Sequence, residues 1–314
     1  MVGGFKQYRL VDWATQGYLG LIALLALWFH DDSVPFWRLL VATHITGMAL
    51  VHLLILAAAR WPKQPVLNFF RSFYPMMLYT GFYRETEFLN RMFVGGYLDE
   101  AFIHLEHRLF GFQPSIAFME WLPYRWAAEL FYGAYFSYYL MIVGVGLALF
   151  LRNRSQFAHY LTVVSILFYL CYLIYVFLPV CGPRVFFEDF PHLGLPPDIR
   201  ALGLAHPMPE AVANGFFPSI ILLIYRHLEA AGAAFPSSHV AVAVCTTWFS
   251  IRYLPRIRIA HVVVTTLLCL STVYCRYHYV VDVLGGITMA LVVIPLVNRL
   301  YRRLEGGATA EESP

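Results

Sequence analysis

Residues 235–286 carry the strongest structural pattern in this sequence. The stretch opens with FPSSH (235–239) and closes with HYVVDVLGG (278–286). Two apolar runs, 241–254 and 259–275, lie between the two histidines and are divided by PRIR (255–258). At a rise of about 1.5 Å per residue, each run crosses most of a hydrocarbon core that is about 30 Å thick. The stretch therefore predicts a membrane hairpin that brings His239 and His278 to the same side of a bilayer.

Asp282 follows His278 by four residues, and on a helix this spacing places both side chains on one face, one turn apart. A carboxylate in that position accepts a hydrogen bond from one imidazole nitrogen and fixes the tautomer, which leaves the other nitrogen free to attack an electrophile. The pattern predicts His278 as a nucleophile and Asp282 as its partner.

The residues before His239 are typical of a helix start that binds phosphate. Pro236 suits the first turn of a helix, because its missing N–H would be unsatisfied there anyway. Ser237 and Ser238 add hydroxyls and backbone N–H groups, and such a helix start binds anions. His239 lies beside them and can protonate a leaving oxygen. We therefore expect attack by His278 on phosphorus, a covalent phosphohistidine, and a leaving alcohol or phosphate that is protonated by His239.

An arginine precedes this stretch. The apolar run 157–178 is followed by PVCGPR (179–184). If the run starts on the opposite side of the bilayer, at RNR (152–154), Arg184 emerges on the side of the histidines. A guanidinium always carries its charge and binds phosphate in bidentate fashion, so we expect Arg184 to contact the phosphate.

These residues resemble the type 2 phosphatidic acid phosphatase superfamily, which also holds the inositol-phosphorylceramide and sphingomyelin synthase-like phosphotransferases. Its motif P-S-G-H corresponds to residues 236–239, with serine for glycine. Its motif S-R-x5-H-x3-D corresponds to residues 271–282, with threonine for arginine. Its motif K-x6-R-P is not found, and GPR (182–184) stands near its place. The segment 105–115, followed by two spans and GPR, looks like the inositolphosphotransferase-like branch.

The resemblance covers roughly residues 99–300 and implies a phosphoryl transfer that needs no metal and no other cofactor. It implies that His278 is the nucleophile, Asp282 its partner and His239 the acid and base. It implies that Arg184, Ser237 and Ser238 are phosphate ligands. Threonine stands where the motif has arginine, and we expect Arg276, two residues before His278, to substitute for that arginine.

The same resemblance implies the substrate class. The donor is a phospholipid, or a polyprenyl or sphingolipid phosphate. With water as the acceptor the protein is a lipid phosphatase, and with a lipid or polyol hydroxyl it is a phosphotransferase of the inositol-phosphate type. The residues leave this choice of acceptor open.

Composition indicates a polytopic membrane protein. The 314 residues are 60% hydrophobic and only 13% charged, whereas soluble chains carry about 25% charged residues. The net charge of +3 comes with basic residues that mark helix ends instead of forming a stripe, which excludes a nucleic-acid partner.

We expect an all-α membrane bundle of six to seven spans in one domain. Its parts are an N-terminal helix pair (1–59), an interfacial region (60–125), a catalytic bundle (126–303) and a disordered tail (304–314). The seven apolar segments are 13–30, 36–58, 126–151, 157–178, 239–254, 259–276 and 281–300.

The region 60–125 mixes charge, proline and aromatic residues, which predicts amphipathic helices lying in the membrane interface. Within it, Glu100, His104 and His107 share one helical face. That spacing allows a metal site, but a solvated interfacial face is the favoured interpretation.

Between Arg184 and His239 lies a long, proline-rich loop, 179–234, which we expect to act as a lid and to carry selectivity. Its apolar part, 211–228, predicts a short helix. The five cysteines do not describe a disulfide framework, and a bond between Cys181 and Cys275 stays open.

Basic residues set the orientation. The turns at 152–154 and 255–258 share one side with Arg299, Arg302 and Arg303. The positive-inside rule makes that side cytoplasmic, so the histidines face the periplasm, the exterior or a lumen. With seven spans, Lys6 and Arg9 lie on the side of the histidines, against the rule.

A rival interpretation is a membrane transporter or lipid-binding protein in which the histidines and aspartate form a proton relay. Such proteins often carry inverted repeats, and none is visible in this sequence. The sequence indicates no oligomeric state.

Overall fold

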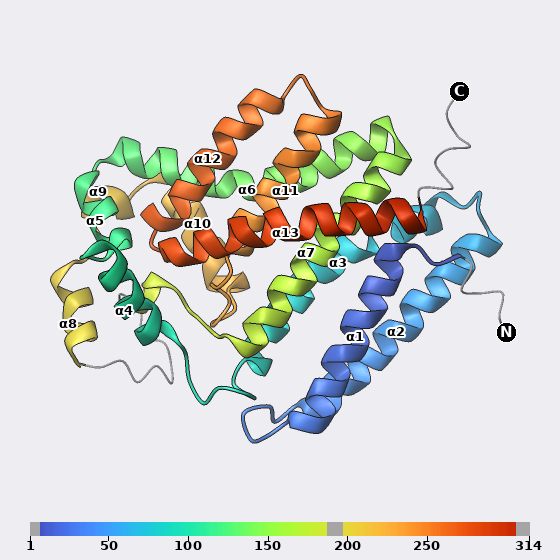
Figure 1. The fold of residues 1–314 in the computed structure, drawn as a ribbon, viewed down its shortest axis with the longest axis horizontal. Coiled ribbons are helices and arrows are strands. Elements are labelled where there is room, and N and C mark those ends of the chain that lie inside the picture. The colour runs from blue at the N-terminus through green and yellow to red at the C-terminus, as the bar shows by residue number, and fades with distance from the viewer. Residues whose placement is uncertain (1–6, 187–196, 306–314) are drawn as a thin grey trace.

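The structure is a computed structural model that describes residues 7–186 and 197–305. Over these residues the chain is helical, with one isolated bridge between Val180 and Ala233 and no β-sheet (Figure 1). The predicted all-α class is confirmed. The helices are α1 (Leu10–Phe29), α2 (Trp37–Arg60), α3 (Pro65–Leu89), α4 (Asp99–Phe110), α5 (Pro114–Trp121), α6 (Arg125–Arg152), α7 (Arg154–Phe177), the 3₁₀ helix η2 (Pro183–Phe186), α8 (Pro197–Ala205), α9 (Glu210–Ala213), α10 (Phe216–Leu228), α11 (Ser238–Tyr253), α12 (Arg258–Tyr274) and α13 (Val280–Leu304).

By length and composition, five of these helices can cross a membrane: α1, α2, α6, α7 and α13. The helices α10 and α12 are apolar but shorter. The five long helices, with α11 and α12, coincide within a few residues with the seven apolar segments read from the sequence, and α10 lies within the short helix predicted over 211–228. The protein is an integral membrane protein with several apolar spans.

Helix α11 lies in the centre of the bundle, between α6, α7, α12 and α13 (Figure 1). Its first turns carry small side chains from Val240 to Ala243, and all of them are fully buried. Small side chains let neighbouring helices approach closely in a membrane protein. The helix that carries His239 is therefore held from several sides.

Helix α3 differs from the prediction of interfacial helices over 60–125. It is a single helix of 25 residues that packs along α7. Phe73 lies 5.0 Å from Phe157 near the start of both helices, and Tyr83 lies 6.1 Å from Tyr172 further along, so the two helices run in the same direction. The interfacial interpretation does not hold for this segment, because two of its charged side chains, Arg71 and Glu85, are paired inside the bundle.

Those pairs join α3 to α1 and α2. The guanidinium of Arg71 donates to both carboxylate oxygens of Asp12, at 2.8 and 2.5 Å, and the Tyr74 hydroxyl donates to the same carboxylate at 2.6 Å. Further along α3, Glu85 lies 3.3 Å from His44. A buried charge is tolerated when it is paired and hydrogen-bonded, so these contacts allow a polar helix in the bundle.

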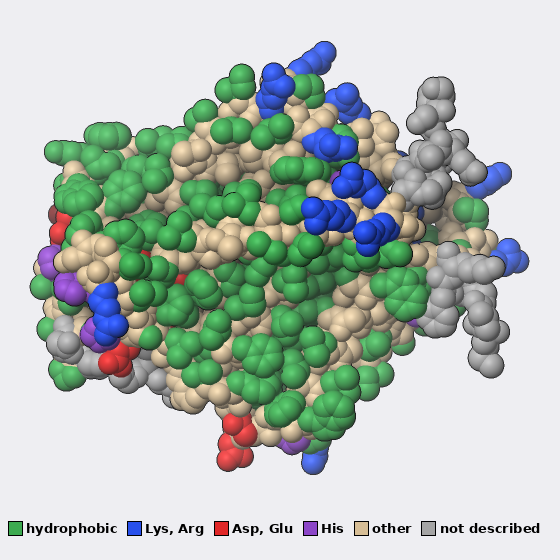
Figure 2. Space-filling view, viewed as in Figure 1, with side chains coloured by type: hydrophobic (Ala, Val, Ile, Leu, Met, Phe, Trp, Pro, Cys, Tyr) green, Lys and Arg blue, Asp and Glu red, His purple; other side chains and the backbone are tan. Residues whose placement is uncertain are grey.

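One end of the molecule is basic. Figure 2 shows Lys and Arg side chains gathered where α13 ends, and Asp, Glu and His side chains at the opposite end. We call these the basic end and the histidine end. Exposed arginines that the turns and the end of α13 contribute to the basic end are Arg152, Arg154, Arg256, Arg258, Arg299, Arg302 and Arg303.

The chain also starts its first helix at the basic end. The backbone N–H of Leu10 donates to the side chain of Glu305, just after α13. Arg9 therefore lies at the basic end, and the expected position on the histidine side is wrong because α3 makes an additional passage through the bundle. Lys6 and residues 306–314 of the tail lie outside the described residues.

Replacing Arg71 by Met should leave the Asp12 carboxylate buried without its cationic partner. Loss of one partner of a buried ion pair lowers the free energy of unfolding by about 3–5 kcal/mol. Arg84→Met is the matched control, because Arg84 pairs with Glu87 at 3.4 Å on the surface, where a pair contributes about 0–1 kcal/mol. Thermal unfolding in detergent measures both variants, and equal shifts would contradict a structural role for the Asp12 pair.

Candidate active site

The two histidines of the hairpin meet at the histidine end. His239 is the second residue of α11, and His278 lies in the turn between α12 and α13. The Nδ1 atom of His239 lies 3.5 Å from Nε2 of His278. The prediction that the hairpin returns both imidazoles to one level is confirmed.

Asp282 contacts His278 as expected, but the two residues do not lie on the same helix. His278 lies before α13, which begins at Val280, so the two residues do not share a helical face. The Asp282 carboxylate reaches back from the first turn, with Oδ2 at 3.3 Å from His278 Nδ1 and at 2.8 Å from the N–H of Tyr279. The carboxylate fixes both the imidazole and the start of the helix.

The starts of α11 and α13 touch each other through backbone atoms. The N–H of Ser237 donates to the carbonyl of Asp282 at 3.0 Å. A Cβ atom at Gly286 would lie only 2.5 Å from the carbonyl oxygen of Ser237. The glycine therefore allows an approach that any other residue would prevent, and this approach sets the separation of the two histidines.

Ser237 caps α11, since its hydroxyl accepts from the N–H of Val240 at 3.3 Å. Pro236 precedes this cap, so it does not occupy the first helical turn as predicted. The N–H of Ser238 donates to the hydroxyl of Tyr175 at 3.2 Å. Part of the predicted phosphate-binding helix start is thus bonded within the protein.

Arg184 lies in η2, beside the turn that carries His278. Gly182 has φ +91°, and a Cβ atom there would lie 2.3 Å from the carbonyl oxygen of Tyr277. The Arg184 guanidinium lies 4.8 Å from the ring centre of Tyr225 and forms an ion pair with Glu229. The structure thus brings Arg184 to the histidine end, as predicted, and adds Tyr225 and Glu229, which the sequence reasoning missed.

Arg276 occupies the turn before His278 with φ +60°, a conformation that is rare for a residue with a side chain. It is almost completely buried, and its Nη1 donates to the carbonyl of His206 at 3.0 Å. This contact ties the histidine turn to the segment between α8 and α9. It gives no support to the predicted phosphate contact.

Two acidic residues that sequence reasoning missed hold this region together from α4. Asp99 accepts from the N–H groups of Cys181 and Gly182, each at 2.9 Å, and from the Tyr279 hydroxyl at 3.1 Å. Glu106 accepts from the N–H of Val280 at 2.5 Å. One helix therefore supports both the Arg184 loop and the start of α13.

Both carboxyl groups are buried, and burial raises the pKa of Asp99 to about 7 and the pKa of Glu106 to about 7. The backbone N–H donors act in the opposite direction, because they stabilise the carboxylate. The spacing of seven residues, two helical turns, is the sequence signal that could have identified this buried face.

The other face of α4 is solvated. Glu100 and His104 are more than half exposed and lie 3.8 Å apart, and His107 is exposed. Within the described residues, no three His, Cys, Asp or Glu side chains converge on a metal position. Cys181 and Cys275 are both free thiols.

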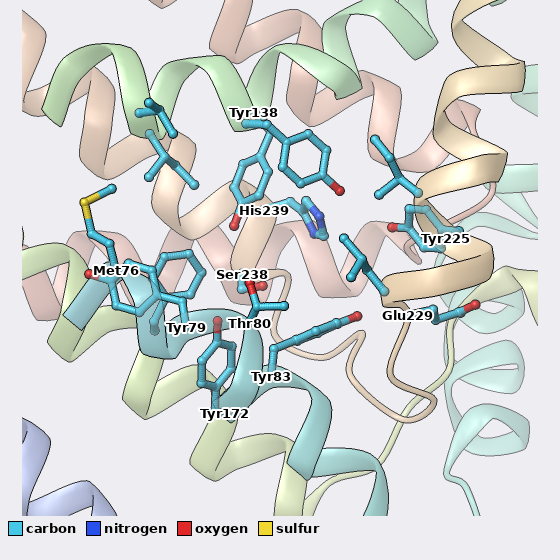
Figure 3. A pocket seen from close by; sticks show the side chains of 16 residues that line it. Met76, Tyr79, Thr80, Tyr83, Tyr138, Tyr172, Tyr225, Glu229, Ser238 and His239 are labelled. Atoms are coloured by element: carbon cyan, nitrogen blue, oxygen red, sulfur yellow. The ribbon is translucent and has the colours of Figure 1, made fainter. Parts of the chain in front are cut away.

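A cavity of about 250 Å³ leads to His239 between α3, α6, α7 and α10 (Figure 3). Ser238, Tyr225 and Glu229 line it together with His239. Two of its apolar side chains, Val143 and Leu228, are 59% and 44% exposed on the outside of the bundle. The apolar side chains that line it are Met76, Ile142, Val143, Phe168, Ile224 and Leu228.

Comparison with protein families matches residues 100–296 to the family described as the PAP2 superfamily. This match covers more than half of the chain, including both histidines and Arg184. The protein belongs to the PAP2 superfamily. No curated protein and no solved structure matches it.

PAP2 proteins are generally phosphatases that work without metal, and this chain is a membrane enzyme of that phosphatase or phosphotransferase type. The PAP2 match begins in α4 and ends in α13. It therefore begins directly after Asp99 and includes Glu106, while α1, α2 and α3 lie outside it.

Replacing Glu106 by Ala should remove the acceptor for the first N–H groups of α13. Loss of such a cap lowers the free energy of unfolding by about 0.5–2 kcal/mol. Glu100→Ala, on the solvated face of the same helix, should change it by less than about 0.5 kcal/mol. Thermal unfolding in detergent tests the pair, and an unchanged midpoint for Glu106→Ala would contradict the capping role.

Proposed function

We propose that this PAP2 protein transfers a phosphoryl group or a phospho-headgroup from a lipid-linked phosphate through a phosphohistidine on His278. The acceptor is water or a hydroxyl group. The observation that supports this most is the 3.5 Å approach of His239 Nδ1 to His278 Nε2, with Asp282 on the other nitrogen of His278. A nucleophile, an orienting carboxylate and an acid are the parts that covalent phosphoryl transfer requires.

In the first step, Nε2 of His278 attacks phosphorus, and a P–N bond forms while the bond from phosphorus to the leaving oxygen breaks. His239 donates a proton from Nδ1 to that oxygen. Asp282 keeps the proton of His278 on Nδ1, so that Nε2 carries the free electron pair, and stabilises the positive charge on the ring. The phosphate enters between the two imidazoles, which separate to admit it.

In the second step, neutral His239 takes a proton from water or from an alcohol. The resulting oxygen attacks phosphorus, and the P–N bond breaks to restore His278. One imidazole thus serves as acid and then as base. The nucleophile and the acid face each other across a single phosphorus position, which both steps require.

Arg184 is the proposed main phosphate ligand, and Ser237 and Ser238 at the start of α11 are further proposed ligands. Binding of a phosphate at Arg184 competes with the ion pair to Glu229. Arg276 is proposed to contribute to phosphate binding only indirectly, since its hydrogen bond to His206 holds the histidine turn in place.

A lipid substrate fits the cavity. Its walls are mainly apolar, and side chains on its outer part belong to the exposed surface of α6 and α10, which faces acyl chains in a membrane protein. The phosphate of a phospholipid, or of a polyprenyl or sphingolipid phosphate, would then lie at His239 with its apolar chain in the cavity. The segments 105–115 and 182–184 favour a phosphotransferase of the inositol-phosphate type as the hydroxyl-acceptor version.

Orientation belongs to the same proposal. The basic end faces the cytoplasm, and the histidine end faces the periplasm, the exterior or a lumen. The position of the α1 start at the basic end supports this, since Arg9 then follows the rule. The substrate phosphate is consequently taken from the extracytoplasmic leaflet.

Incubation with a panel of lipid phosphates labelled at phosphorus should yield a labelled protein that is stable in base and labile in acid. His278→Ala should abolish the label and lower turnover by roughly 10³-fold or more, because the nucleophile is absent. His239→Ala should slow turnover by about 10²–10⁴-fold, the usual contribution of an acid and base.

His104→Ala is the matched control for these variants, because His104 is exposed on α4 and takes no part in the proposed steps. It should turn over like the parent protein. Unchanged turnover in both His278→Ala and His239→Ala would end the enzyme assignment and favour the rival proton relay.

Orientation can be tested with two engineered cysteines at exposed positions. Glu100→Cys at the histidine end should react with a membrane-impermeant maleimide on intact cells. Arg256→Cys at the basic end should react only after permeabilisation. The parent protein measures the background of its native cysteines, and the reverse pattern of labelling would contradict the proposed orientation.

A further inference from the structure

Tyr135 contacts His239 at the ring nitrogen opposite to the one that faces His278. Its side chain is fully buried on α6, and its hydroxyl lies 3.1 Å from Nε2 of His239. The two rings are 4.9 Å apart, and the ring of Tyr138 lies 4.4 Å from His239. The two nitrogens of His239 therefore have separate partners, Tyr135 at Nε2 and His278 at Nδ1.

We infer that Tyr135 is a positioning residue that fixes the working tautomer of His239. This inference rests on the proposed function. In the proposed steps, His239 gives up and regains a proton at Nδ1 while Nε2 keeps its proton throughout. The Tyr135 oxygen can accept a hydrogen bond from Nε2–H in both protonation states, because a hydroxyl is an acceptor as well as a donor.

Tyr225 completes this arrangement. The hydroxyls of Tyr135 and Tyr225 are hydrogen-bonded to each other, and Tyr225 lies under the guanidinium of Arg184. When the Tyr135 oxygen accepts from His239, its own proton points to Tyr225. A continuous set of contacts then joins the proposed phosphate ligand to the proposed acid, with no change in the charge of either tyrosine.

Without the Tyr135 hydroxyl, a proton on Nε2 would be buried without this acceptor, which favours the tautomer that carries its proton on Nδ1. That tautomer cannot serve as the base in the second step, because Nδ1 already carries a proton. In the first step, the protonated His239 loses the hydrogen-bond acceptor for its Nε2–H. Phe at this position keeps the ring that packs on His239, so the change removes one oxygen atom.

The leaving group separates this role from a structural one. A long-chain alkyl phosphate needs protonation of its leaving oxygen, whereas a nitrophenyl phosphate releases a stable phenolate without it. Tyr135→Phe should slow the single-turnover cleavage of the alkyl ester about 10- to 100-fold, a part of what an acid contributes. It should slow cleavage of the nitrophenyl ester by less than about 3-fold, and it should leave KM for both esters nearly unchanged.

Tyr160→Phe is the matched control. It also removes a buried hydroxyl, which donates to the carbonyl of Ile142 at 2.8 Å, but it lies away from the histidines in the bundle. It should change the rates of both esters equally and slightly. Tyr225→Phe should repeat the pattern of Tyr135→Phe at smaller amplitude, and this variant keeps the test available if Tyr135→Phe does not fold.

Equal slowing of both esters by Tyr135→Phe and by Tyr225→Phe, or slowing no greater than in Tyr160→Phe, would overturn the inference and leave the proposed function standing. A parent protein that cleaves neither ester and forms no phosphohistidine with any lipid phosphate would instead overturn the proposed function, and the inference with it.

Discussion

Direct contact between the starts of α11 and α13 is the constraint on which the catalytic geometry depends. The N–H of Ser237 donates to the carbonyl of Asp282, and Gly286 leaves room for the carbonyl of Ser237. Each helix carries one histidine at or just before its start, so the separation of the helix starts becomes the separation of the imidazoles. A side chain at Gly286 would force the helices apart and remove the approach that a two-histidine phosphoryl transfer needs.

Residues other than the two histidines and Asp282 hold that contact in place. Asp99 and Glu106 on α4 bind backbone N–H groups of the Arg184 loop and of the α13 start, and they do so where water is excluded. Arg276 adopts an uncommon backbone conformation, with positive φ, at the turn before His278. Buried acceptors of this kind stabilise one arrangement strongly, because an alternative arrangement would leave polar groups unpaired.

The lengths of the apolar runs were sufficient to predict the hairpin and the meeting of the two histidines, because apolar runs of this length cross a bilayer. Two crossings return the chain to the side on which it started. The sequence could not identify α3 as a bundle helix, since the partners of Arg71 and Glu85 lie on other helices. Hydropathy counts those charges as exposed, whereas the fold pairs them. On α4, the spacing of Glu100 and His104 suggested one polar face, but a short amphipathic helix does not reveal which polar face will be buried. The contact of Asp282 with His278 followed from their spacing, although the helix begins after the histidine.

In the proposed mechanism, one phosphorus atom fits between His278 and His239, within reach of Arg184. An experimental structure with orthovanadate bound, as a mimic of five-coordinate phosphorus, tests this most directly. We expect vanadium bonded to Nε2 of His278, with an apical oxygen at Nδ1 of His239 and equatorial oxygens at the Arg184 guanidinium. Vanadate bound elsewhere, or two histidines too far apart to share one vanadium centre, would contradict the mechanism.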